Sequence, residues 1–274
     1  TFEAGPVDAT GLRIVVSNPA TAIDEIEVYA GVGGYAAEVL ADGPIAYWQF
    51  EDSNSAADSA GTTNGTYNGI TFEPGVSGQA ARWNPADLPD NPGSSNIDFG
   101  DFGAGALAQL TNIDDPGDDP NFDENKQTSV EFWVKTSQVS GNANNWRSPL
   151  VFGEESPGDG DIQWGWITDA GEVGFAVNDA GGGIYRGPVI NDNAWHHVVQ
   201  TFDFGSGDHV TYVDGTAVIT ETSAGNNWQD ADGGLIRYMG WNSRVDAGAG
   251  AASPHLLGQF EGLLDEVAIY NKIL

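Results

Sequence analysis

The sequence contains no cysteine among its 274 residues. Disulfide bonds, thiolate metal sites and cysteine nucleophiles are therefore excluded. Basic residues are also scarce, because nine Lys and Arg stand against 40 Asp and Glu, which gives a formal net charge of −31. A chain with so few cations cannot follow a phosphate backbone, so we predict no nucleic-acid partner. Contact with an anionic membrane surface is disfavoured for the same reason.

Long apolar runs are missing as well. No stretch approaches the roughly 18 residues that a membrane-spanning helix needs, so we expect no membrane insertion. The high acidity, with 38 Gly and many turns rich in Asn and Asp, suits an exported protein whose self-repulsion is screened by salt or calcium. The chain begins at Thr1 without a signal-like segment. We therefore expect a processed product or a fragment, extracellular or at the cell surface and of bacterial origin.

What is present predicts β-structure almost throughout. Short apolar or alternating stretches separated by Gly, Asp and Asn turns are typical of a two-sheet antiparallel jelly-roll sandwich. Asp214-Gly215 predicts a type I′ hairpin turn. No segment of ten or more residues shows helical periodicity, and residues 36–41 offer one turn at most. The expected strands are residues 11–16, 23–29, 45–50, 96–102, 128–135, 149–153, 162–168, 172–178, 184–189, 195–203, 208–214, 216–221, 234–240 and 259–270.

Four ordered motifs between residues 43 and 274 resemble those of laminin G-like, or concanavalin A-like, lectin-glucanase domains. They are an opening strand and loop at 43–67, an aromatic strand at 129–135, a hairpin at 195–215 and a closing strand at 260–271. The resemblance implies an all-β, calcium-associated jelly roll used for binding, adhesion or assembly, without implying one ligand. This chain departs from the pattern by a long insertion at about 84–125 and by an N-terminal strand pair at 1–34. That N-terminal extension resembles the tail of a discoidin-like (galactose-binding-like) module.

Several oxygen-bearing side chains are candidate calcium ligands. Calcium prefers six to eight oxygens from carboxylates, carbonyl groups and water. Four such side chains follow the opening strand, and the resemblance implies that the aspartate of the closing strand lies beside that loop. The alternative is that all of them are ordinary turn residues on an acidic surface. The candidate ligands are Glu51, Asp52, Asp58, Asn64 and Asp265, with Asp52 and Asp265 foremost.

Catalytic arrangements are not evident in the sequence. Glycoside hydrolysis needs two carboxylates facing each other about 5–9 Å apart, and related glucanases place them at alternate positions of one strand. Glu131 has no acidic residue two positions before or after it. His196 and His197 are adjacent in a predicted strand, so their rings point to opposite faces and cannot chelate one ion. We therefore expect no enzyme activity and assign no catalytic residue.

Nine tryptophans offer apolar faces for stacking on sugar rings. Those in the family motifs are interpreted as core residues. Three others stand in Asn-rich, loop-like sequences, which suit a glycan platform or a protein interface about equally. These three candidate ligand or interface residues are Trp146, Trp228 and Trp241.

The N-terminal strands suggest a second function. Residues 1–31 cannot bury a core alone, because a two-stranded piece is marginal in water. They must pack on their own chain or on a neighbour, and strand addition to a neighbour would build a filament. The sequence slightly favours a calcium-stabilised, self-associating structural or adhesion protein, with a carbohydrate-binding module as the alternative. The candidate assembly residues are Ile14, Val16, Ile23, Ile26 and Val28.

Overall fold

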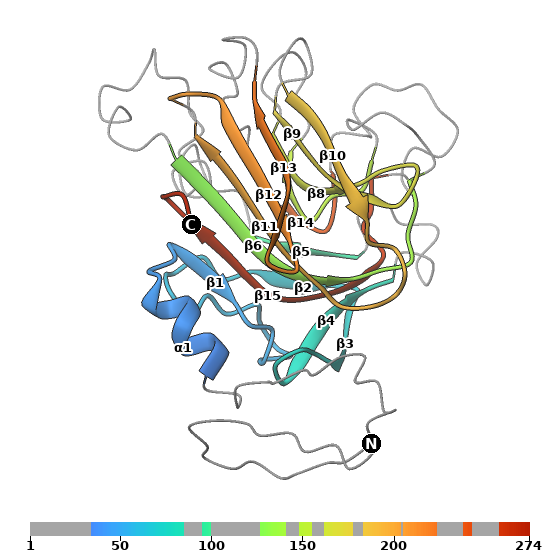
Figure 1. Ribbon diagram of the computed structural model, residues 1–274. Helices are drawn as coiled ribbons and strands as arrows, with labels where there is room; N and C mark the ends of the chain where they lie inside the picture. Colours follow the sequence, from blue (N-terminus) through green and yellow to red (C-terminus); the bar gives the residue numbers. More distant parts are fainter. Residues whose placement is uncertain are drawn as a thin grey trace, which may run out of the picture.

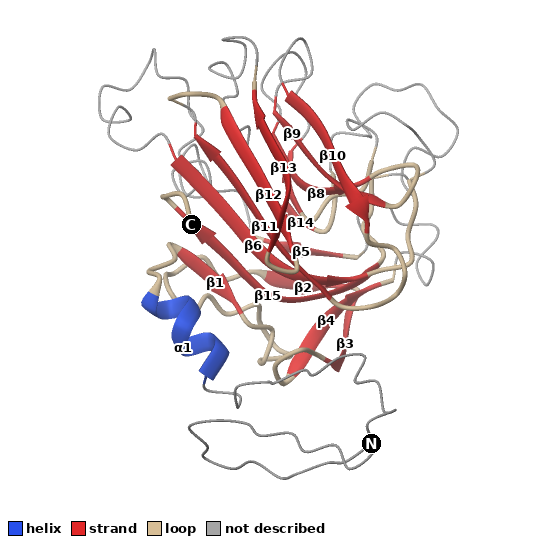
Figure 2. Cartoon of the chain, in the orientation of Figure 1, coloured by secondary structure: helices blue, strands red, loops and turns tan. Residues whose placement is uncertain are grey.

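The computed structural model describes residues 34–84, 95–99, 127–140, 148–154, 162–177, 183–203, 205–223, 238–242 and 258–274. Within these residues, one helix is followed by fifteen strands (Figures 1 and 2). The elements are α1 (Gly34–Ala41), β1 (Ala46–Trp48), β2 (Thr66–Asn68), β3 (Ile70–Pro74), β4 (Gln79–Trp83), β5 (Asn96–Asp98), β6 (Gln127–Lys135), β7 (Phe152–Glu154), β8 (Ile162–Ile167), β9 (Glu172–Val177), β10 (Gly183–Val189), β11 (His196–Asp203), β12 (Asp208–Val213), β13 (Thr216–Thr222), β14 (Tyr238–Met239) and β15 (Gly262–Tyr270).

The strands form two antiparallel sheets that pack face to face. The eight-stranded sheet has the order β13-β12-β11-β6-β15-β4-β3, and β1 also pairs with β15. The seven-stranded sheet has the order β10-β9-β8-β7-β14-β5-β2. About half of the neighbouring strands in these orders are distant in sequence, which is typical of a jelly roll. The all-β sandwich predicted from the strand pattern and the motifs is therefore confirmed.

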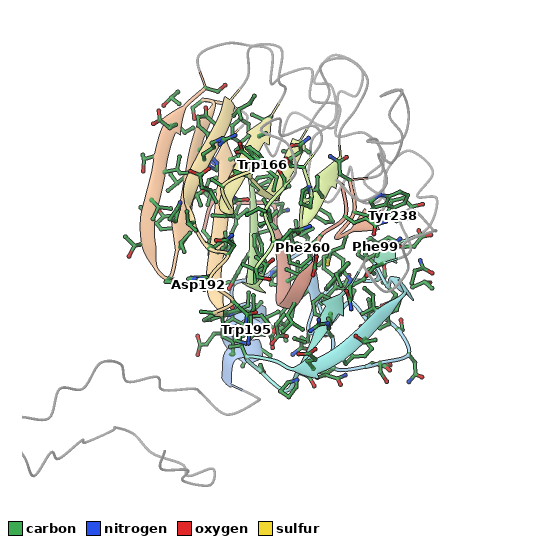
Figure 3. The ribbon with its side chains drawn as sticks, turned by 90° about the vertical axis from the view of Figure 1, so that its right-hand side faces the viewer. Phe99, Trp166, Asp192, Trp195, Tyr238 and Phe260 are labelled. Atoms are coloured by element: carbon green, nitrogen blue, oxygen red, sulfur yellow. The ribbon has the colours of Figure 1, made fainter. Side chains whose placement is uncertain are left out.

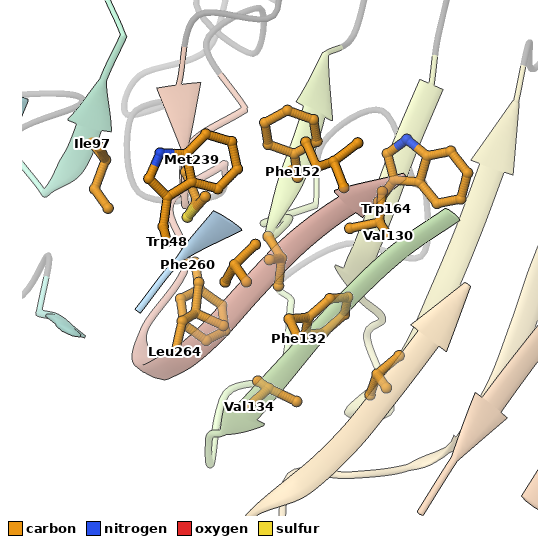
Figure 4. Packing of buried hydrophobic residues seen from close by; sticks show 14 of the residues in the cluster. Trp48, Ile97, Val130, Phe132, Val134, Phe152, Trp164, Met239, Phe260 and Leu264 are labelled. Atoms are coloured by element: carbon orange, nitrogen blue, oxygen red, sulfur yellow. The ribbon is translucent and has the colours of Figure 1, made fainter. Parts of the chain in front are cut away.

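The core lies between the two sheets (Figure 4). Successive strand residues point to opposite faces, so Val130, Phe132 and Val134 of β6 point toward the seven-stranded sheet. Trp164 of β8 and Met239 of β14 meet them from the other side, and all five side chains are fully buried. The long alternating pattern of β6 thus positions one wall of the core.

A buried polar side chain also ties the sheets together. Gln200 of β11 points inward, and its amide oxygen accepts the N–H of Gly165 at 2.8 Å. Its amide nitrogen donates to the carbonyl oxygen of Gly174 at 3.0 Å and to the hydroxyl of Thr211 at 3.3 Å. Both glycines belong to the seven-stranded sheet, so this side chain links backbone of one sheet to a strand of the other.

His209 of β12 extends that link. Its ring stacks on Phe175 of the opposite sheet, with centroids 4.1 Å apart and planes 9° from parallel. Burial lowers the pKa of His209 to about 3, against the smaller raising effect of its hydrogen bond with Thr201. The neutral ring donates from Nδ1 to the Thr201 carbonyl oxygen at 2.9 Å, and Nε2 accepts from the Thr211 hydroxyl at 2.8 Å.

The helix α1 corrects the expectation of one turn at most. Residues 34–41 form eight residues of α-helix that cover the outer face of the eight-stranded sheet (Figure 1). Ala36 and Val39 pack on Tyr47, Ala268 and Tyr270. The apolar face is only two turns long, too short to register as a periodic pattern. No helix among the described residues is long and apolar enough to cross a membrane.

Candidate functional site

A row of side chains crosses three strands on the outer face of the seven-stranded sheet. Met239 and Ile97 point into the core, so their neighbours Tyr238 and Asp98 point outward. The register pairs Tyr238 with Asp98, and Asp98 with Thr66 of β2. Tyr238 and Asp98 are half-buried and Thr66 is exposed. Figure 3 shows Tyr238 at this side of the sandwich.

The next row adds two amides to the same face, of which Asn68 is half-buried and Asn96 is buried. Asn68 pairs with Asn96, and its amide nitrogen donates to the Asn96 amide oxygen at 3.0 Å. Together with the first row and with Trp241, which packs on Tyr238, these residues are called the outer-face site. Its members are Thr66, Asn68, Asn96, Asp98, Tyr238 and Trp241.

Trp241, one of the three predicted tryptophans, is brought onto Tyr238 by the backbone of Gly240. The two rings lie 4.6 Å apart between centroids and 50° from parallel, and Trp241 is half-buried. Gly240 adopts φ +77°, which a side chain rarely tolerates. A Cβ on Gly240 would also stand 2.0 Å from the Trp83 indole nitrogen. This position therefore needs glycine, and the glycine turns Trp241 back over the strand.

The other two tryptophans, Trp146 and Trp228, lie outside the described residues. Next to Trp241, the Asn242 side chain donates to the Ser148 carbonyl oxygen at 3.4 Å. The side chain that follows Trp241 therefore contacts the backbone of Ser148.

A second tryptophan on this face, Trp166, is buried. Gly165 adopts φ +65° at a register shift, so Trp164 points into the core while Trp166 points outward. Trp166 is nevertheless fully buried with Leu150 and Ala176 (Figure 3). The sequence did not single it out, and its burial makes it a support for the face and not a platform.

Three of the five predicted calcium ligands serve in local turns. The Asp58 carboxylate pins the opening loop, and Asn64 accepts the Asp58 N–H at 2.8 Å. Asp52 is exposed and accepts the backbone and side-chain N–H groups of Asn54, both at 2.9 Å. These hydrogen bonds lower the pKa of Asp52. The N–H groups that Asp58 accepts belong to Tyr47, Ala60, Gly61 and Thr63.

The other two, Glu51 and Asp265, meet at the turn between β3 and β4. Glu51 accepts the N–H of Gln79 at 3.1 Å. One oxygen of Asp265 accepts the N–H groups of Val76 at 2.7 Å and Ser77 at 3.1 Å. The structure therefore brings Glu51 and Asp265, which are 214 positions apart in the sequence, to the same turn, while Asp52, which the sequence analysis placed foremost with Asp265, hydrogen-bonds within its own loop.

Asp265 stands out because it is fully buried and its Oδ1 has no hydrogen-bond partner among the described residues. Burial raises its pKa to about 7, and the nearby charge of Glu51 adds to this. Its neighbour Glu266 adopts φ +51° where the closing strand shifts register. Among the described residues, however, no three His, Asp or Glu side chains are arranged to hold a metal ion.

A buried cluster beneath α1 was missed by sequence reasoning. Glu131 accepts hydrogen bonds from the Tyr35 hydroxyl at 2.7 Å, the Tyr270 hydroxyl at 2.8 Å and His197 Nε2 at 3.0 Å. Burial alone would raise the pKa of Glu131, but these three donors outweigh it and the pKa is lowered. The one available signal was a glutamate in the middle of the apolar run from Val130 to Val134. In the structure this carboxylate fastens α1 to the sheet.

The two adjacent histidines have separate partners, as their alternation predicts. His197 reaches Glu131 on the outer face, with its ring stacked on Trp133 at 4.9 Å. The His196 ring lies between two carboxylates, with Nδ1 2.8 Å from Asp214 and Nε2 3.1 Å from Asp192. Since its two nitrogens contact different carboxylates, His196 links the loop before β11, which contains Asp192, to the β12–β13 turn, which contains Asp214.

Comparison with solved structures gives matches to the sandwich. Domain 4 of AbnA, an extracellular arabinanase of family GH43 from Geobacillus stearothermophilus, solved in complex with arabinotriose, is 21% identical. The match covers 83% of this chain and 91% of that domain, with a TM-score of 0.51. A mutant Trypanosoma rangeli sialidase that displays trans-sialidase activity is 15% identical, with a TM-score of 0.54. The match covers 86% of this chain but only 32% of the sialidase.

At these identities the structural matches show the fold alone. No curated protein matches the chain. A family model, that of the laminin G type described as the concanavalin A-like lectin/glucanases superfamily, matches residues 110–274. This is more than half of the chain, and it contains β6 to β15. Of the earlier strands, β1, β3 and β4 join the eight-stranded sheet, and β2 and β5 join the seven-stranded sheet. The chain therefore belongs to the concanavalin A-like lectin/glucanases superfamily, as a laminin G-like domain.

Proposed function

We propose that this protein is a non-catalytic carbohydrate-binding module of an exported, extracellular or surface-bound protein. The observation that carries the proposal is the half-buried Tyr238–Trp241 pair beside Asp98 on the outer-face site. Sugar rings stack their C–H faces on aromatic rings, while their hydroxyl groups bond to carboxylates and amides. The site offers both kinds of contact within one small area.

Two further observations support a binding role. The fold neighbour from the arabinanase was solved with arabinotriose, which makes this neutral oligosaccharide a reasonable first probe. Glu131, a buried acid on the opposite sheet, accepts hydrogen bonds from three donors, which suits a structural carboxylate. Adhesion to a glycan-coated surface would follow from such binding.

A glycan array tests this function. The parent protein, Trp241→Ala and Trp195→Ala are applied to the same array, which includes arabinotriose and both neutral and acidic glycans. Trp195 is a half-buried tryptophan that lies well apart from Tyr238 in Figure 3, so it is the matched control. We expect a defined set of bound glycans that Trp241→Ala loses and Trp195→Ala retains. Equal binding by all three proteins, or no binding at all, would refute the proposal.

We also propose that calcium stabilises the domain through Glu51 and Asp265. The unpaired, buried Oδ1 of Asp265 next to Glu51 is the observation that fits a cation, because a bound ion would supply the missing partner. Calcium needs six to eight oxygens, so backbone carbonyl groups and water must complete the set. The proposed set leaves out Asp52, Asp58 and Asn64, because each makes hydrogen bonds within its own turn.

Thermal unfolding in excess calcium and in chelator tests this. At 100 times its dissociation constant a ligand specific for the folded state adds about 2.7 kcal/mol, or roughly 5–10 °C in Tm for a domain of this size. We expect Asp265→Asn to abolish that shift and Asp52→Asn, the matched control, to keep it. A parent protein whose Tm ignores calcium would contradict the proposal, as would an Asp265→Asn variant that still responds.

A further inference from the structure

The sheet edges of this sandwich are protected unequally. A free edge strand presents unpaired N–H and C=O groups, and proteins guard it with proline, charge or short length. At the ends of the two sheets, β10 contains Arg186 and Pro188, β3 ends at Pro74, and β2 has three residues. β13 is different, because its seven residues contain no proline, lysine or arginine.

The outer edge of β13 is open among the described residues. Its one sheet partner there is β12, and six of its seven side chains are exposed. A bulge at Val218 interrupts the register, but Ile219 to Thr222 pair regularly with Thr211 to Asp208. Four regular residues therefore remain available to another strand.

Exposed apolar side chains surround this edge. Val218 is 39% exposed, and on the adjacent edge strand β10 Ile184 is 45% and Val189 57% exposed. The two edges are neighbours, since a Cβ at Gly187 of β10 would lie 3.5 Å from Ile219 of β13. An added strand would cover apolar surface as well as backbone.

The charge on this edge selects the strand that fits. Glu221 is exposed and has no ion pair among the described residues. Asp208 begins the adjacent strand β12, and it pairs with Asp203 at the end of β11. A strand that carries a positive charge would therefore pair with this edge more favourably than a neutral or acidic strand. Arg13 is the one Lys or Arg in the first 81 residues, and it lies in the predicted strand 11–16. The other predicted strand, 23–29, carries three acids, so this edge would repel it.

We propose that residues 11–16 of a second copy of this chain add to the open edge of β13, with Arg13 facing Glu221. The proposal goes beyond glycan binding, and it assigns an acceptor to the predicted assembly residues Ile14 and Val16, which lie outside the described residues. Each copy carries one donor and one acceptor, so the contact is heterologous and repeats from copy to copy.

A neighbour is favoured over the same chain by geometry. Figure 1 places α1, which follows residues 1–33, at the far end of the sandwich from the tip of β13. To reach Glu221 in its own chain, the connecting residues 17–33 would have to run extended along the molecule. Asn18-Pro19 and the glycines of 31–34 predict turns in that connection.

Sedimentation of the full chain over a concentration series, in millimolar calcium and moderate salt, tests the proposal with a charge swap. We expect concentration-dependent oligomers for the parent. Arg13→Glu alone and Glu221→Arg alone should each weaken association at least about fivefold, and the double variant should restore it to within about twofold. Glu25→Arg, on the strand that is not used, is the matched control and should associate no less than the parent.

Thr220→Pro provides a second probe, because proline removes an edge N–H without changing charge. Circular dichroism confirms that each variant keeps its β-structure. A parent that stays monomeric at every concentration would overturn the proposal. Single charge variants that lower Tm while the mass remains that of one chain would overturn it in favour of docking within the same chain. A double variant that fails to recover association would also contradict the Arg13–Glu221 pairing.

Discussion

His209 shows how a single buried side chain makes the sandwich sensitive to acid. Its pKa is about 3 in the folded protein against 6.5 in the unfolded chain. Between these values the unfolded state binds more protons, so this contribution to stability is complete above pH 6.5 and declines as the pH falls toward 3. At pH 4.5 the loss is roughly 2–3 kcal/mol, because each unit of pKa difference corresponds to about 1.4 kcal/mol.

Urea unfolding of the parent and of His209→Gln at pH 7 and pH 4.5 measures this. Glutamine can keep a donor toward Thr201 and an acceptor toward Thr211, but it does not titrate. We expect the parent to lose about 2–3 kcal/mol more than the variant on acidification. Equal losses in the two proteins would show that His209 is not the acid-sensitive group.

His196 titrates with the opposite sign. Burial alone lowers its pKa, but Asp214 and Asp192 together raise it above 6.5. Its ion pairs therefore contribute fully below pH 6.5 and are lost as the pH rises through the folded pKa. We expect His196→Gln to show a smaller decline in Tm above pH 6.5 than the parent. A variant whose Tm depends on pH as the parent's does would be evidence against a stabilising role of these ion pairs. The effect is small, because both aspartates are largely exposed.

At the level of elements, α1 depends on one polar contact. Tyr35→Phe removes the hydroxyl that Glu131 accepts at 2.7 Å and leaves that buried carboxylate one donor short. We expect a loss of about 1–2 kcal/mol in the free energy of unfolding. Leu40→Ala, on the exposed side of the same helix, should stay within about 0.5 kcal/mol. Equilibrium urea unfolding separates the two, and a Tyr35→Phe variant as stable as the parent would contradict this role.

The Gly240 turn offers a second test at this scale. Gly240 and Gly215 have nearly the same φ, +77° and +74°. A Cβ at Gly240 meets Trp83, whereas at Gly215 nothing lies within 4 Å. Gly240→Ala should therefore be the less stable variant by about 1–3 kcal/mol, which is the cost of overpacking. Similar melting temperatures for Gly240→Ala and Gly215→Ala would mean that Trp83 can move aside without a measurable loss of stability.

Strands were predictable where apolar alternation was long, and less so elsewhere. β6, β11 and β12 lie within a residue or two of the predicted ranges, and Asp214-Gly215 makes the predicted turn, with positive φ at both residues. β2 to β4 were missed because they are short and partly exposed, and because β3 ends at Pro74. Their pattern comes from pairing with β5 and β15, which no local window contains.

For the whole molecule, the motifs were sufficient to predict the sandwich, and the site was only partly predictable. Trp241 was singled out by its Asn-rich surroundings, but Asp98 and Asn96 enter the outer-face site through cross-strand register. Likewise, Asp58 and Asp265 look alike in sequence. Only the fold shows that both carboxylate oxygens of Asp58 accept backbone N–H groups, while one oxygen of Asp265 has no hydrogen-bond partner among the described residues.

A crystal structure of the protein with the oligosaccharide that binds it most tightly would test the glycan-binding face most directly. We predict a sugar ring against Tyr238 and Trp241, with hydroxyl groups bonded to Asp98 or to the amide of Asn68. In the same crystals, Trp241→Ala should lose the sugar, consistent with an affinity drop of about tenfold. A sugar bound on the eight-stranded sheet, or anywhere without contact to the outer-face site, would contradict the account.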